Sequence, residues 1–453
     1  MTNRRGPNHQ LRALLIEAGW TQEALARAVN TLGTEIGAVL RYDRTSVAHW
    51  LSGTRPRHPV PQLAAEALSR RIGRTVTPAG AGFPHSGPAP APADVISGFA
   101  ALCRSDTDPG RRLVLRQRPY RVADAAPPPR PEVPGPPRPL GARTERTAAL
   151  HDAVGFFTAS LDAHGGRHAR TALTAYLADD VVPLLAAPHP ARHRADLFVL
   201  ASRLAFLMAR MYEDGLLHGI AQRYYTYAHR LAGESGDRTA WSVVLRAMSA
   251  QALRLGHLAP ALQLAEAATA GARSAPPAHQ AFVQAQLAVV LGRGGDRRGA
   301  LAAMERAEKA AERSHGAGGG ASFDTYPAAA LHFQTSAMLE ALGELSPALA
   351  ALRRATAERA PGDLRGRALS QARFGQLLLR TGHLEEACAV WDGFVAAQGR
   401  LRSADAERAL RDMRQALRPY RNRKPAAELL ARTVPMPRGG TGGAEERTTA
   451  RPG

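Results

Sequence analysis

The chain has 453 residues and a formal net charge of +20, with 59 lysines and arginines against 39 acidic residues. This length is sufficient for two or three domains, and the positive balance favours a polyanionic partner. Two cysteines far apart in the sequence provide neither a disulfide framework nor a zinc site. No run of about 18 apolar residues occurs and no apolar signal core follows the first residues, so we expect a cytoplasmic protein with no membrane contact.

The first 80 residues have the densest positive charge, with 11 arginines against 5 acidic residues. Within them, residues 21–29 have the pattern of a short amphipathic helix. Thr21 carries a hydroxyl group that can cap the first turn, and Glu23 places a negative charge in that turn. Leu25 and Val29 lie four residues apart, which places both on one apolar face.

Residues 43–53 predict a second helix. Asp43 can cap its start, and Gly53 can end it in a left-handed backbone conformation. Its apolar face contains Val47, Trp50 and Leu51, and its other face contains Arg44, Thr45, Ser46 and His49. Arginine reads guanine with a forked geometry, serine and threonine can bond to either base, and a helix N-terminus attracts phosphate. The second helix therefore has the pattern of a DNA recognition helix.

The two helices resemble the helix-turn-helix of the phage-repressor-like (XRE) regulators, in which helix two begins Thr-Gln-x-x-Leu-Ala and the recognition helix ends in glycine. The residues that match this signature are Gln22, Leu25, Ala26, Val47 and Gly53. The resemblance implies that Arg44, Thr45 and Ser46 read bases and that Gln22 approaches a phosphate. One departure is the connection between the helices, which is about three or four residues in such motifs but spans residues 30–42 here.

We expect an additional packed turn within residues 30–42, because four apolar side chains fall there: Leu32, Ile36, Val39 and Leu40. Arginines just outside the second helix are expected to contact the DNA backbone. The candidate DNA-binding residues, in a domain over residues 1–79, are Gln22, Arg41, Arg44, Thr45, Ser46, His49, Arg55 and Arg57.

Residues 80–143 contain fourteen prolines and predict a semi-rigid, extended linker. Two pieces of this segment, residues 95–103 and 113–122, have apolar patterns that would allow them to dock on a domain. At the other end of the chain, residues 431–453 are basic and predict a disordered tail.

Residues 144–430 are rich in alanine and leucine, and they contain a repeated motif in which a small residue follows a glycine by five positions. Its clearest instances are Gly256 and Ala261, Gly295 and Ala300, Gly343 and Ala348, and Gly382 and Ala387. These glycines are 39, 48 and 39 residues apart, and a weaker instance surrounds Gly215. Repeats of this length indicate helix pairs that stack into an α-solenoid.

The pattern resembles tetratricopeptide repeats, although each unit here is longer. We therefore predict an all-α protein with a small helix-turn-helix domain and a tetratricopeptide-like solenoid of six or seven helix pairs over residues 144–430. A curved stack of this kind forms a concave groove that binds peptides or partner proteins.

Aromatic residues are concentrated near the middle of the array and are candidates for lining a ligand groove: Tyr212, Tyr224, Tyr225, Tyr227 and Trp241, with His229 nearby. The alternative is that they belong to the core and to the seams between repeats, because helical spacing alone would place several of them inside.

The sequence shows no catalytic constellation. The pairs His164 with His168 and His189 with His193 lack the glutamate of a zinc-hydrolase helix, and the glycine-rich residues 316–322 lack the lysine of a phosphate loop. We expect no enzymatic activity, no metal and no cofactor.

The sequence thus predicts a transcription regulator that binds double-stranded DNA and whose repeats bind a peptide or protein ligand or mediate dimerisation. By resemblance, such regulators include dimeric, peptide-responsive proteins. A homodimer is expected because a single small module binds modestly, whereas two can read half-sites about one helical turn apart. The alternative is a protein–protein interaction scaffold whose N-terminal helices bind protein instead of DNA.

Overall fold

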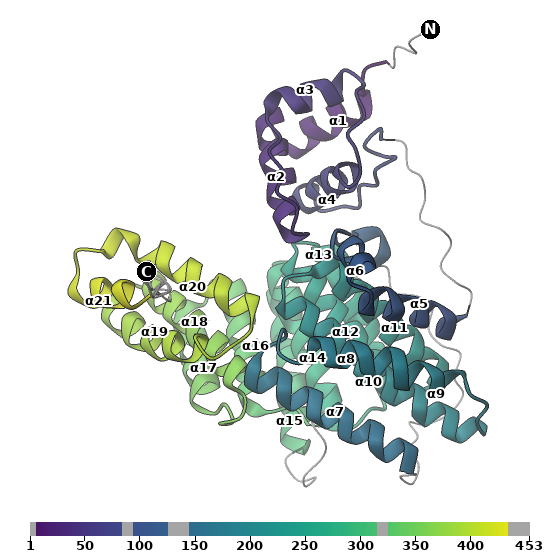
Figure 1. Ribbon diagram of the computed structural model, residues 1–453. Coiled ribbons are helices and arrows are strands. Elements are labelled where there is room, and N and C mark those ends of the chain that lie inside the picture. The colour runs from purple at the N-terminus through teal and green to yellow at the C-terminus, as the bar shows by residue number, and fades with distance from the viewer. Residues whose placement is uncertain (1–5, 84–93, 126–144, 315–324, 434–453) are drawn as a thin grey trace, which may run out of the picture.

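The protein is all-α. The computed structural model describes residues 6–83, 94–125, 145–314 and 325–433, and these ranges contain helices and no strands. Figure 1 shows a small N-terminal bundle, here called the head (residues 6–83), which lies against a larger array of paired helices, here called the body. The predicted all-α class, with helices packed in a repeat arrangement, is confirmed.

The head consists of four helices: α1 (His9–Ala18), α2 (Gln22–Glu35), α3 (Arg44–Leu51) and α4 (Val60–Ile72). Their inward faces form one apolar core, to which residues 76–83 add Val76 and Phe83. The side-chain amide of Asn8 donates to the carbonyl oxygen of Ala81 (2.9 Å), which ties the start of the head to its end.

Helix α2 is longer than the sequence pattern predicted. It begins after Thr21, whose hydroxyl accepts a hydrogen bond from the amide of Ala24 (3.1 Å), as expected for a cap. It then continues into the segment 30–42, because buried Leu32 extends the apolar stripe by another turn. The connection to α3 is therefore residues 36–43, and the expected additional turn is the end of α2 itself.

Part of the segment predicted as a linker is folded. Residues 94–125 form α5 (Val95–Thr107), α6 (Pro109–Arg116) and a short 3-10 helix (Val122–Ala125). Phe99 and Leu102 of α5 are buried in the core of the body, and Pro109 occupies the first turn of α6, where proline is compatible with a helix. The prediction of a linker is wrong for these residues. Five ranges lie outside the described residues: 1–5, 84–93, 126–144, 315–324 and 434–453. They include most of the rest of the predicted linker, the glycine-rich residues 316–322 and most of the predicted tail.

Five helix pairs follow one another in the described part of the body. They are α10 (Ala191–Asp214) with α11 (His218–Ser235), α12 (Arg238–Arg254) with α13 (Leu258–Gly271), α14 (Pro277–Arg293) with α15 (Arg297–Ser314), α16 (Ala328–Ala341) with α17 (Leu345–Ala357), and α18 (Leu364–Arg380) with α19 (Leu384–Gln398). Less regular helices flank them: α7 (Glu145–His164), α8 (Arg170–Tyr176) and α9 (Val182–Ala186) before, and α20 (Ala404–Leu417) and α21 (Lys424–Arg432) after.

The glycine–alanine motif marks the turn within four of these pairs. Gly256, Gly295, Gly343 and Gly382 all have positive φ angles, between 82° and 90°, a conformation that glycine adopts without strain. The alanines five residues later are all fully buried, where a small side chain allows the paired helices to approach closely. In the first pair the motif is shifted by one residue, because Leu216 has a φ of 59° and buried Ala221 follows it by five positions.

Asp214, at the end of α10, links the two ends of the body. One of its carboxylate oxygens accepts hydrogen bonds from Arg365 Nε (2.5 Å) and the Ser403 hydroxyl (2.8 Å), and the other accepts from the amide of Gly166 (2.7 Å). Gly166 lies just before α8, Arg365 is in α18 and Ser403 caps α20. The last helices of the array therefore return to the first, and the repeats do not form an open-ended stack.

Replacing Asp214 with alanine should lower the free energy of unfolding by about 3 kcal/mol, because Arg365 would remain largely buried without its carboxylate partner. Thermal unfolding followed by circular dichroism measures this change. Asp412→Ala, which removes an exposed carboxylate from α20, is the matched control. Equal unfolding temperatures for the two variants would contradict the structural role of Asp214.

Candidate nucleic-acid interface

Helix α3 presents one apolar and one polar face, as the sequence predicted. Val47, Trp50 and Leu51 are buried in the core of the head. Arg44, Thr45 and His49 are exposed, so their hydrogen-bonding groups can reach a partner without rearrangement of the head. At the other end of α3, Gly53 has a φ of 104°, and the amide of Thr54 donates to the carbonyl oxygen of His49 (2.9 Å). The expected left-handed helix end is therefore present.

A hydrogen-bonded cap formed by Asp43 and Ser46 fixes the start of α3. Asp43 Oδ1 accepts hydrogen bonds from both the amide and the hydroxyl of Ser46, each at 2.8 Å. The bond from the Ser46 amide, followed by that from its hydroxyl, lowers the pKa of Asp43 below its usual value. Because the Ser46 hydroxyl donates to Asp43, its donor is occupied within the head. Ser46 is a capping residue here, a role that the sequence analysis did not assign to it.

The connection before α3 is held by the two ends of the segment 30–42. The side-chain amide of Asn30 donates to the carbonyl oxygen of Tyr42 (2.8 Å), and the Tyr42 amide donates to Asn30 Oδ1 (2.9 Å). The Tyr42 ring packs edge-on against Trp50 of α3, with 5.2 Å between ring centroids. Arg41 is exposed beside this anchored tyrosine, so its backbone position is fixed relative to α3.

The remaining candidates lie at the ends of helices around α3. Gln22 is half-buried in the first turn of α2, and Arg55 and Arg57 are exposed between α3 and α4. Arg41, Arg55 and Arg57 thus place three exposed arginines in the segments that flank α3, and the core of the head keeps α2 and α3 packed on each other.

A buried polar contact attaches the head to the body. Glu66 of α4 and His257, which precedes α13, are 4% and 2% exposed, and His257 Nε2 donates to Glu66 Oε1 at 2.7 Å. Tyr120 stacks on the His257 ring, with 5.5 Å between centroids and 21° between ring planes. In Figure 1, α3 lies on the side of the head away from α13, the helix that follows His257. The body therefore does not cover the polar face of α3.

Arg70 connects the same contact to the rest of the head. Its Nε donates to Glu66 (2.9 Å), and its two terminal nitrogens donate to the two carboxylate oxygens of Glu35 (2.8 and 3.0 Å). Because Glu35 is the last residue of α2, this bidentate pair joins α2 and α4 at the end of the head nearest the body.

The aromatic residues proposed for a ligand groove are buried instead. Tyr212, Tyr224, Tyr225, Tyr227 and Trp241 are each less than a tenth exposed. The hydroxyls of Tyr212 and Tyr224 donate to the two oxygens of Asp106 (2.5 and 2.7 Å), and burial raises the pKa of Tyr224 well above its usual value. The interpretation of these residues as a groove lining is therefore wrong, and they belong to the core. Asp106, the partner of Tyr212 and Tyr224, was missed because it lies in the segment assigned to the linker.

Within the described ranges, no group of three or more histidine, cysteine, aspartate or glutamate side chains is arranged to bind a metal ion. The ring centroids of His164 and His168 are 4.3 Å apart, and those of His189 and His193 are 5.2 Å apart, without further ligands of this kind. In the same ranges, the helices are all too short or too polar to cross a membrane.

The fold thus defines a protein in which a four-helix head with a capped, exposed polar helix is attached to an α-helical repeat body. A family model described as the SP15 N-terminal domain matches residues 11–84. This match spans the head and does not extend to the repeats, so it describes the module that carries α3. No curated protein matches the chain.

Replacing Asp43 with alanine should speed hydrogen exchange at the first amides of α3, because the Ser46 amide would lose its acceptor. Asp43→Asn should keep slow exchange, since asparagine is an equally good cap. The lowered pKa means that the carboxylate cap is fully present above pH 3.8 and is lost as the pH falls through the lowered value. Equal exchange rates in the alanine and asparagine variants would show that the cap does not hold α3.

Replacing His257 with alanine should detach the head, because Glu66 would lose its only partner on the body within the described ranges. We expect a larger radius of gyration by small-angle X-ray scattering and faster hydrogen exchange along α4. His383→Ala is the matched control, because His383 occupies the same position after Gly382 but is exposed. An unchanged scattering profile for His257→Ala would contradict this attachment.

Proposed function

We propose that this protein is a sequence-specific, DNA-binding transcription regulator of the XRE type that acts in the cytoplasm. In this proposal, α3 reads bases in the major groove, and the surrounding arginines contact phosphates. The body binds a peptide or protein ligand or mediates formation of a homodimer, and so controls how the head is presented to DNA.

The observation that carries the proposal is the exposed polar face of α3. Arg44, Thr45 and His49 project from a helix whose start is fixed by Asp43 and whose opposite face is buried. A recognition helix must be held rigidly in this way, because a base-reading arginine has to donate to two acceptors of one guanine at once. Arg41, Arg55 and Arg57 supply positive charge beside it, where phosphate contacts would position the helix without adding sequence preference.

Dimerisation is proposed because a single head would bind DNA only weakly. A recognition helix of eight residues reaches few base pairs, so one head alone gives limited affinity and selectivity. Two heads carried by two bodies would read two half-sites, and the second binding event would be favoured by its high effective concentration.

A titration of the full-length protein with random-sequence duplex DNA at several salt concentrations tests DNA binding by the head. The logarithm of the binding constant should fall linearly with the logarithm of the salt concentration, because binding of cationic side chains to phosphates releases counterions. Arg55→Ala combined with Arg57→Ala, which removes two of the exposed arginines proposed to contact phosphates, should weaken binding and make this slope shallower by about 1 for each phosphate that is no longer bound.

The matched control is Arg293→Ala combined with Arg298→Ala, which removes two exposed arginines from the body. If both double variants lowered the affinity equally, binding would reflect overall charge and the head would have no special role. If the wild-type protein showed no salt-dependent binding, the scaffold alternative would replace the DNA-binding proposal.

A further inference from the structure

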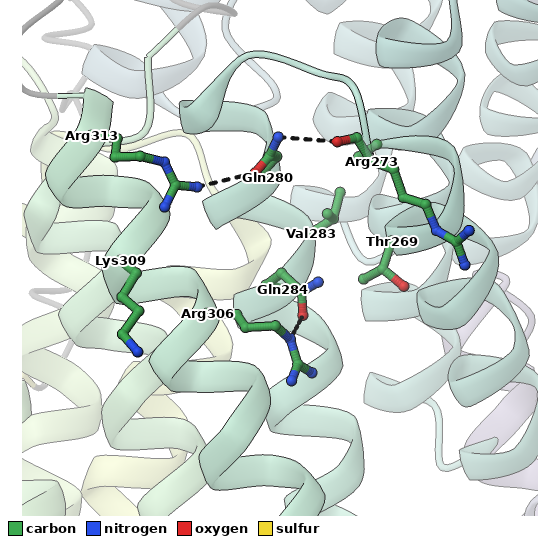
Figure 2. A pocket seen from close by; sticks show the side chains of 9 residues that line it. Thr269, Arg273, Gln280, Val283, Gln284, Arg306, Lys309 and Arg313 are labelled. Carbon is green, nitrogen blue, oxygen red and sulfur yellow. Dashed lines mark hydrogen bonds between the residues drawn. The ribbon is translucent and has the colours of Figure 1, made fainter.

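A positively charged groove crosses the body between α13 and α15, above α14. Its cavity measures about 300 Å³, and its lining consists of Thr269, Ala272, Arg273, Gln280, Val283, Gln284, Arg306, Lys309 and Arg313. Figure 2 shows the three helices side by side, with the cationic side chains of α15 on one wall and Arg273 on the opposite side. The lining contains four cations and no carboxylate. A cavity of this size is within the range that binds small molecules.

The cations of α15 form a straight row along the groove. Arg306, Lys309 and Arg313 follow the i, i+3, i+7 spacing that places side chains on one helical face, and seven residues of helix extend over about 10 Å. Lys309 pairs with Glu305 at 2.6 Å, but both side chains are 62% exposed. Such a surface ion pair is weak and can exchange for a better anion.

Two glutamines on α14 orient the arginines of this row. Arg306 Nε donates to Gln284 Oε1 (3.2 Å), and a terminal nitrogen of Arg313 donates to Gln280 Oε1 (3.2 Å). In the part of the chain that the structure describes, neither arginine pairs with a carboxylate. The glutamines thus hold the guanidinium groups over the groove without neutralising them, which leaves their remaining N–H donors available.

The groove presents donors where a ligand would lie. The acceptor oxygens of both glutamines are already engaged by arginines, and the amide nitrogen of Gln280 donates to the carbonyl oxygen of Ala275 (2.9 Å). The lining is therefore rich in donors, and a ligand rich in acceptors matches it best. An extended peptide fits poorly, because each of its residues brings a backbone N–H that needs an acceptor.

We propose that this groove binds a linear oligophosphate, either free or as the phosphate tail of a nucleotide. Each phosphoryl group offers several acceptor oxygens, and a chain of them matches a row of cations spread over about 10 Å. Arginine is suited to this role, since its planar fork donates two parallel hydrogen bonds to one phosphoryl group. Ala272 and Val283 form the floor of the groove, but each is only 1% exposed and offers a nucleoside little apolar surface, so the phosphate tail is the part that the site is expected to recognise.

Calorimetric titration of the full-length protein with sodium tripolyphosphate tests this site. Arg306→Gln combined with Arg313→Gln should weaken binding at least about tenfold, because two charge-assisted hydrogen bonds to the phosphates would no longer form. Arg293→Gln combined with Arg298→Gln removes two arginines from the same two helices, α14 and α15, outside the groove, and should leave the affinity unchanged. All four positions are exposed, and circular dichroism verifies that both variants remain folded.

Further titrations identify the ligand. ATP that binds as tightly as tripolyphosphate would show that the phosphate tail alone is recognised, and tighter ATP binding would show that the nucleoside also contacts the floor. An oligoglutamate peptide that binds as tightly as tripolyphosphate would overturn the proposal, as would equal loss of affinity in the two double variants. The groove is separate from the head, so the DNA titration on the same variants distinguishes failure of this site from failure of the DNA-binding proposal.

Discussion

The buried carboxylate of Glu66 sets the relation between the head and the body. A buried carboxylate without partners is unfavourable by several kcal/mol, and Glu66 has two: Arg70 within the head and His257 on the body. Satisfying this one group requires α4 to face the start of α13. Once α4 is placed, the core of the head determines where the other helices lie, and α3 is directed away from the repeats. The exposure of the candidate DNA-binding face is therefore a consequence of a contact on the opposite side of the head.

Buried carboxylates also connect distant segments within the body. Asp106 joins α5 to the first helix pair through Tyr212 and Tyr224, and Asp214 joins α10 to the segment before α8, to α18 and to the start of α20. In each case a buried acid accepts hydrogen bonds from residues that are far apart in the sequence. Because breaking such a set leaves charged or polar groups buried without partners, the segments it connects are held together more firmly than apolar packing alone would require.

Local patterns were sufficient to predict much of this structure. The glycine–alanine spacing located the turns of the later repeats, since a left-handed glycine and a buried alanine are requirements of a single helix pair. The cap at Asp43 and the apolar face of α3 were likewise visible within eleven residues of sequence. DNA binding by this face remains a prediction.

Contacts between residues far apart in the sequence could not be predicted from these local patterns. The role of His257 could not be recognised, because His383 has the same position in its motif and is exposed. Prolines on both sides hid the folded segment that contains Asp106, and the burial of the central tyrosines depends on that segment. The sequence pattern assigned the hydroxyl of Ser46 to base reading, and only the geometry showed that it donates to Asp43 as part of the cap.

The central claim is that exposed residues of α3 select particular base pairs. Enrichment of bound duplexes from a random-sequence library, using the full-length protein and an Arg44→Ala, Thr45→Ala variant, tests it most directly. The account predicts that the wild-type protein enriches a defined sequence, and that the variant loses preference at some of its positions while still binding duplex DNA. Enrichment of no sequence by the wild-type protein, or of the same sequence by both proteins, would contradict the account.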